Sequence, residues 1–199
     1  MFNHEEKSKT KNIDTLVYTD PSADIDDQLA IYMGLKTGIK LTIVVGGTGK
    51  LSNWQHFSSL GPVGEPVESF DKGELNCILK PKYIVVIAPN IDDIYNKIDL
   101  ENCEKVYYMG NAMQNLPNTH VCVQDNSGPS FNDTGAEKFR KAIQDANIVT
   151  RICTSAEGKT KMCNMELFKE LNLTEAQIDE SIKAAFGLCL GRMNPEHVA

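Results

Sequence analysis

The sequence has no apolar run close to the roughly 18 residues that a membrane-spanning helix needs. Residues 1–12 are charged and lack the apolar stretch of a signal peptide. Basic residues are also scarce: 20 Lys and Arg stand against 27 Asp and Glu, a net charge of −7. This balance gives no electrostatic support for nucleic-acid binding. We therefore expect neither a membrane nor a nucleic acid as a partner.

Paired cysteines are missing as well. The six cysteines are scattered and form no Cys-x-x-Cys pair, so neither a zinc site nor a disulfide framework is indicated. Several lie inside apolar runs, where a reduced and buried thiol is the expected state. Together with the charged N-terminus, these features predict a cytoplasmic protein.

The length of 199 residues and the hydrophobic fraction of 41% suit one sizeable α/β domain. We expect a solvated or disordered tail over residues 1–12 and an α/β core over residues 13–155. A helical segment over residues 156–199 would pack on the core or on a partner. Within this segment, two helices are predicted over residues 164–171 and 174–190.

Strand-like and helix-like patterns alternate along the core. Strands are predicted over residues 13–18, 40–45, 83–88, 105–109, 120–123 and 147–153. Helices are predicted over residues 28–36, 90–98 and 133–145, and residues 58–69 are predicted to be a loop. This order predicts an α/β fold with an open, mainly parallel sheet and helices on both faces.

An acidic loop follows the first predicted strand. It contains four carboxylates within eight residues, namely Asp20, Asp24, Asp26 and Asp27. Ligands of α/β sheets usually bind in loops that leave the carboxyl ends of strands. Crowded carboxylates repel one another unless protons or a cation relieve them, and a hard cation such as Ca²⁺ or Mg²⁺ prefers oxygen ligands. The loop is therefore a candidate metal site, although Asp24 is more simply interpreted as a helix cap.

Two other interpretations of this loop are less suitable. An EF-hand needs Gly at its sixth position and Glu at its twelfth, where this chain has Ile25 and Ile31. A phosphoaspartyl phosphatase of the haloacid-dehalogenase type remains open, but it requires Asp where this chain has Ser22.

Several other polar or glycine-rich features have simple structural interpretations. The run Gly46 to Lys50 lacks the spacing of a phosphate-binding loop and is interpreted as a turn. Trp54 is expected to be a packing residue. Asp92 and Asp93 are interpreted as acids that complement the dipole of their own predicted helix rather than as ligands.

Residues 19–31, which read Thr-Asp-Pro-x-x-Asp-Ile-Asp-Asp-Gln-Leu-Ala-Ile, resemble the N-terminal signature of the nucleoside hydrolase family. Shorter stretches resemble further motifs of that family in the same order, at residues 42–47, 86–94, 106–110 and 130–132. The resemblance covers about residues 13–155 and implies a nucleoside hydrolase-like α/β sheet.

The resemblance also implies an activity, the hydrolysis of the N-glycosidic bond of ribonucleosides by a Ca²⁺-bound water and an Asp general base. By position, Asp20 matches the general base and a metal ligand, and Asp27 matches a second metal ligand. The main-chain carbonyl of Ile91 matches a third. The positions that match ribose-binding residues are Asp26, Asn126 and Asn132. The implied partner is a nucleoside or ribose-like small molecule of purine or pyrimidine metabolism.

The chain departs from the family pattern at several positions. Tyr18 replaces a signature Asp, Ser22 replaces a Gly and Ser130 replaces a Glu. The late His-Asp pair of the family is missing, since His197 is followed by Val198. Waters or a second chain would have to complete a Ca²⁺ shell of six to eight oxygens, which leaves a homo-oligomer open. The alternative function is a catalytically inactive nucleoside hydrolase-like protein with a binding or structural role.

Overall fold

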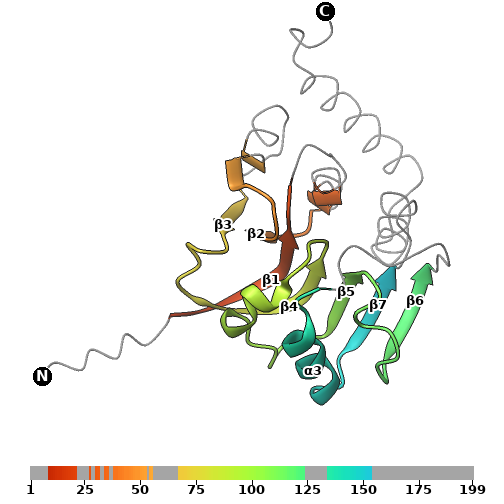
Figure 1. The fold of residues 1–199 in the computed structure, drawn as a ribbon. Helices are drawn as coiled ribbons and strands as arrows, with labels where there is room; N and C mark the ends of the chain where they lie inside the picture. Colours follow the sequence, from red (N-terminus) through yellow and green to blue (C-terminus); the bar gives the residue numbers. More distant parts are fainter. Residues whose placement is uncertain are drawn as a thin grey trace, which may run out of the picture.

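The computed structural model describes residues 9–21, 27, 30–31, 34–35, 38–52, 54–55, 67–123 and 134–153. These residues form one sheet of seven strands in the order β3-β2-β1-β4-β5-β7-β6 (Figure 1). The strands are β1 (Thr10–Thr19), β2 (Leu41–Val45), β3 (Glu68–Asp71), β4 (Ile78–Val86), β5 (Lys105–Met109), β6 (Thr119–Val123) and β7 (Val149–Cys153). Every pairing in the sheet is parallel, so the predicted α/β fold with a parallel sheet is confirmed.

The order of the strands places a topological switch point between β1 and β4. From β1 the chain moves outward to β2 and β3, then returns to form β4 on the other side of β1. Connections therefore leave these two neighbouring strands in opposite directions. In open α/β sheets, ligands bind beyond the carboxyl ends of the strands at such a point.

Both faces of the sheet carry a buried core, because successive side chains of a strand point to opposite faces. On one face, Leu16 and Tyr18 belong to a cluster that includes Phe139 and Ile143 of α3 (Glu137–Asp145). On the other face, Val17 belongs to a second cluster, which includes the helical residues Ile31 and Trp54. Helical residues thus cover both faces, and Trp54 is a packing residue, as predicted. None of the helices formed by the described residues has the length and apolar character needed to cross a membrane.

β1 begins earlier than the sequence indicates. The sequence predicts that residues 10–12 belong to the tail, but they pair with residues 78–80 of β4. The pairing of β1 with β2 starts only at Thr15, so this first part of β1 has one neighbour and exposed side chains. Without a buried face there is no apolar alternation in the sequence to reveal the strand.

β3 was missed in the same way. Its first two residues lie in the stretch predicted to be a loop. All four of its residues are half-buried, and it lies at the edge of the sheet, beside β2 alone. Its polar sequence, Glu-Ser-Phe-Asp, carries no apolar pattern, so backbone pairing with β2 accounts for the strand.

The helix predicted over residues 90–98 is wrong. The chain instead forms two 3₁₀ turns, η1 (Ile91–Asp93) and η2 (Tyr95–Lys97). Asn90 has a left-handed backbone with φ of 62°, and the N–H groups of Asp93 and Ile94 bond to carbonyls three residues earlier. A period of three residues also places Ile91 and Ile94 on one buried side, so their spacing does not distinguish this structure from an α-helix.

The remaining boundaries differ by a few residues. β4 begins at Ile78 rather than Tyr83, and β7 begins at Val149 because Asn147 has a left-handed backbone. α3 begins at Glu137, after Gly135 with φ of 66°. The helices predicted within residues 156–199 lie outside the described residues.

Candidate functional site

Asp20 follows β1 directly, at the switch point of the sheet, and is half-buried. Gly47 lies between this residue and the turn that follows β4. A Cβ atom on Gly47 would stand 3.1 Å from Oδ2 of Asp20 and 3.3 Å from Cδ of Pro89. The carboxylate of Asp20 and the turn after β4 therefore flank the same glycine.

The turn after β2 packs tightly against the end of β1. It closes through a 3.0 Å hydrogen bond from the N–H of Gly49 to the carbonyl of Gly46. A Cβ on Gly46 would stand 2.1 Å from the phenol oxygen of Tyr18, and one on Gly49 would stand 2.4 Å from Cα of Asp20. The turn predicted from the sequence is thus confirmed. Because only glycine permits such a close approach, its glycines also allow the turn to pack against the end of β1. The clustering of glycines after a strand was the signal for that role.

Tyr18 is fully buried and joins the ends of three strands. Its phenol donates a hydrogen bond to the carbonyl of Asn90 over 3.1 Å and accepts one from the N–H of Gly47 over 3.3 Å. The pKa of Tyr18 is raised to about 12, chiefly by burial; the bond from Gly47 acts to lower it, and the charges of Asp93, Asp20 and Asp71 act to raise it. The neutral phenol is the form that can make both bonds. The sequence identified Tyr18 only as a departure from a family motif.

Asp27 is buried and belongs to the helix that follows the acidic loop. Its Oδ1 accepts a 3.1 Å hydrogen bond from the hydroxyl of Thr19, the last residue of β1, which is fully buried. This bond holds the carboxylate of Asp27 beside the end of β1. Two of the predicted site residues, Asp20 and Asp27, therefore both lie next to Thr19.

Ile91 offers only its main chain to a ligand, because its side chain is fully buried in the core. Its carbonyl accepts a 3.1 Å hydrogen bond from the N–H of Ile94. A carbonyl oxygen has two lone pairs, so this bond is compatible with a second partner. The carbonyl thus fits the proposed ligand role in its chemistry.

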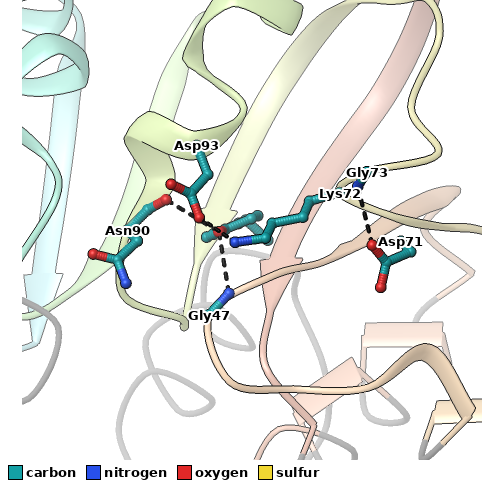
Figure 2. Close-up of polar contacts among 7 residues, drawn as sticks. Gly47, Asp71, Lys72, Gly73, Asn90 and Asp93 are labelled. Carbon is teal, nitrogen blue, oxygen red and sulfur yellow. Dashed lines mark hydrogen bonds and ion pairs between the residues drawn. The ribbon is translucent and has the colours of Figure 1, made fainter.

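Asp92 and Asp93 lie in the first turn of their element, as the sequence predicts, but that element is a 3₁₀ turn and their carboxylates bind other segments. The carboxylate of Asp93 forms an ion pair with Lys72, which follows β3 (Figure 2). The carboxylate of Asp92 accepts hydrogen bonds from the backbone N–H groups of Lys138 and Phe139, in the first turn of α3. The carboxylates of both acids thus bind groups of other segments.

The other predicted site residues, Asp26, Asn126 and Asn132, lie outside the described residues, as does Asp24, the predicted helix cap. Within the part of the chain that the structure describes, no group of three or more His, Cys, Asp and Glu residues could hold a metal ion. Of the predicted metal ligands, the carboxylates of Asp20 and Asp27 and the main-chain carbonyl of Ile91 lie within the described residues.

Comparison of the sequence with models of known protein families gave no match. A search of curated proteins gave no match either. Any assignment of function therefore depends on the residues at the ends of β1, β2 and β4.

Proposed function

We propose that this chain is a divergent nucleoside hydrolase-like enzyme that cleaves the N-glycosidic bond of ribonucleosides, with Asp20 as the general base. One observation supports the proposal most. Asp20 and the turn that contains Ile91 lie on either side of Gly47, beyond the carboxyl ends of β1 and β4. The residues of the signature-like segment that the structure describes are thus found where an open α/β sheet binds ligands.

The predicted donors are chemically suited to a calcium ion. Asp20, Asp27 and the carbonyl of Ile91 all provide oxygen atoms. Ca²⁺ is coordinated by six to eight oxygen ligands. Water, substrate hydroxyls and further residues would complete the shell. A bound ion would orient a water molecule, lower its pKa and hold the ribose hydroxyls.

The chain's own residues would then perform the proton transfer and stabilise charge. Asp20 removes a proton from the water as its oxygen forms a bond to C1′ of the ribose. The bond between C1′ and the base nitrogen breaks, and the base departs with the bonding electrons and takes up a proton. The carboxylates of Asp26 and Asp27 would stabilise the positive charge that develops on the sugar ring. The products are ribose and the free base.

The activity is tested by incubating the protein with inosine, uridine and adenosine, with Ca²⁺ or with EDTA, and measuring the released base by chromatography. We expect release only with Ca²⁺. Asp20→Asn should abolish it, because the amide cannot accept the proton. Asp145→Asn is the matched control, since Asp145 is exposed and pairs with Lys141 on α3. Full activity of Asp20→Asn, or no turnover of any nucleoside, would overturn the proposal.

A second candidate is a non-catalytic protein that keeps a metal or ribose site. Tyr18 favours it, because a neutral phenol engaged by Asn90 and Gly47 stands where the family signature has a carboxylate. Ligands that bind only the folded state raise the melting temperature. A rise with Ca²⁺ or ribose, without base release from any nucleoside, would select this candidate over the enzyme.

A further inference from the structure

The N-terminus of α3 is capped by a residue from a distant segment. Ala136, at the N-cap position, provides no side-chain cap. Instead, Oδ2 of Asp92 accepts a 3.0 Å bond from the N–H of Lys138, and Oδ1 accepts a 2.9 Å bond from the N–H of Phe139. A carboxylate is favoured here, because the first N–H groups of a helix have no partner within the helix and carry positive partial charge.

The backbone of the same turn is bound to the residues that precede α3. The N–H of Asn90 donates to the carbonyl of Thr134 over 2.9 Å, and the N–H of Asp92 donates to that of Gly135 over 2.8 Å. A Cβ on Gly135 would stand 2.4 Å from Oδ1 of Asn90, so the two segments touch without room for a side chain. Four hydrogen bonds thus join the turn after β4 to the start of α3.

α3 is a firm support for this turn. The side chains of Phe139 and Ile143, on α3, are buried in the core. Arg140 donates from Nη1 to the carbonyls of Ala112 and Gln114, so the helix also contacts the turn that follows β5. The turn that contains Ile91 is therefore attached to an element that is itself fixed in two directions.

We propose that Asp92 is a positioning residue, which fixes the carbonyl of Ile91 by attaching its turn to α3. This inference rests on the proposed function for its significance, since that function gives the carbonyl of Ile91 to the metal and Asn132 to the ribose. Asn132 precedes Thr134 by two residues in the sequence. The hydrogen bonds from the N–H groups of Asn90 and Asp92 thus link the turn that contains Ile91 to residues 134 and 135, which follow Asn132 in the sequence. A carbonyl held in place before binding loses less conformational freedom when the metal arrives.

The test compares Asp92→Ala and Asp92→Asn with two controls. Asp93→Ala removes the adjacent carboxylate, which pairs with Lys72 and does not cap α3. Ala142→Gly weakens α3 through the low helix propensity of glycine while leaving the cap intact. Hydrogen exchange of the backbone at residues 90–94 and the dissociation constant for Ca²⁺ are measured for each variant.

We expect Asp92→Ala to speed exchange at residues 90–94 well beyond Ala142→Gly. It should also weaken Ca²⁺ binding by about tenfold, as loss of an outer-shell partner does in metal sites. Asp92→Asn should recover part of both effects, because its amide oxygen still accepts one bond. Asp93→Ala should leave both near the wild-type values.

Two failures are distinguishable. If the wild-type protein does not bind Ca²⁺, the metal role of the proposed function fails, while the exchange data still decide the role of Asp92. Exchange at residues 90–94 that is no faster in Asp92→Ala than in Ala142→Gly would overturn the positioning role, whatever the metal data show. So would unchanged Ca²⁺ affinity in Asp92→Ala when the wild type binds the ion.

Discussion

The phenol of Tyr18 donates a hydrogen bond to the main-chain carbonyl of Asn90, 3.1 Å away, across the switch point of the sheet. The same oxygen accepts the N–H of Gly47 from the turn after β2. One buried side chain therefore connects the ends of β1, β2 and β4, the three strands whose loops form the candidate site. Changes at Tyr18 should affect the stability of the fold and the geometry of the site together.

Tyr18→Phe should lower the free energy of unfolding by about 1–3 kcal/mol, because it leaves buried partners of the hydroxyl unsatisfied. The lost partners are the carbonyl of Asn90 and the N–H of Gly47. Urea unfolding followed by circular dichroism measures the change. Tyr83→Phe is the matched control: its hydroxyl donates to Glu104 at an exposed position, and its removal should cost less than about 0.5 kcal/mol. Equal effects of the two variants would contradict the role assigned to Tyr18.

Tyr18 should also make stability fall in alkaline solution. Its pKa is raised from 10.0 to about 12 in the folded protein. Below pH 10 both states hold the proton, so the contribution to stability is fully present. As the pH rises from 10 to 12 the unfolded state ionises first, and stability falls by up to about 3 kcal/mol. Lysines titrate in the same range, so the measurement is the difference between wild type and Tyr18→Phe. That difference should shrink as the pH rises; a constant difference would contradict a raised pKa.

The sequence predicted the centre of the sheet well and its margins poorly. The segments that became β2, β5 and the buried half of β1 are apolar because both faces of the sheet are covered there. The start of β1 and the whole of β3 lack such a face, and they form through backbone pairing that side-chain patterns do not record. The sequence predicts a helix where 3₁₀ turns follow β4, because Ile91 and Ile94 fit either period.

For the candidate site, the sequence suggests possible reactive groups but not the residues that arrange the surrounding turns. Asp20 and Asp27 stood out because carboxylates are rarely crowded without a reason. Tyr18 contacts a residue 72 positions away in the sequence, and Asp92 contacts one 46 positions away. A local sequence pattern does not indicate such distant contacts. The roles of such residues become visible only when the strands are brought side by side.

Gly46→Ala should destabilise the protein severely or prevent its folding. The added methyl group would lie 2.1 Å from the phenol oxygen of Tyr18 and 2.3 Å from Cζ, inside van der Waals contact with a buried ring. We expect a loss of more than about 3 kcal/mol, since overpacking in a buried site costs 1–3 kcal/mol and occasionally more. Gly73→Ala is the control, because its nearest neighbour would be Oδ1 of Asp71 at 3.5 Å. Thermal melting of both variants checks the prediction, and a normal melting temperature for Gly46→Ala would contradict the close contact.

The double variant Tyr18→Phe with Gly46→Ala separates the hydroxyl from the ring in this contact. Phe lacks the oxygen at 2.1 Å but keeps ring atoms at 2.3–2.4 Å from the added methyl. We therefore expect the double variant to recover little of the stability lost in Gly46→Ala. Urea unfolding of the four members of this double-mutant cycle measures the coupling. Full rescue by Tyr18→Phe would mean that only the hydroxyl is in the way.

Cys103 should react slowly with alkylating reagents in the folded protein. It is a free, half-buried thiol that donates a 3.7 Å hydrogen bond to the carbonyl of Lys105. Its pKa is raised from 9.0 to about 12, chiefly by burial; the bond to Lys105 acts to lower it, and the charge of Glu104 acts to raise it. At pH 8 the thiolate would be roughly a thousandfold rarer than in an exposed cysteine, although a thiolate of higher pKa is more nucleophilic. We therefore expect alkylation roughly fiftyfold slower than in concentrated urea.

Mass spectrometry of the peptide that contains Cys103, after timed reaction with iodoacetamide, measures this rate. The dependence on pH separates the effect of the pKa from simple shielding. For the folded protein, the rate should rise about tenfold for each pH unit up to the pKa near 12, because the thiolate fraction rises in that proportion. In urea the rate should level off once the pH passes the ordinary thiol pKa of 9.0. If the rate in the folded protein also levels off near pH 9, the thiol is shielded by its neighbours while its pKa is ordinary, and the desolvation assigned to Cys103 is wrong.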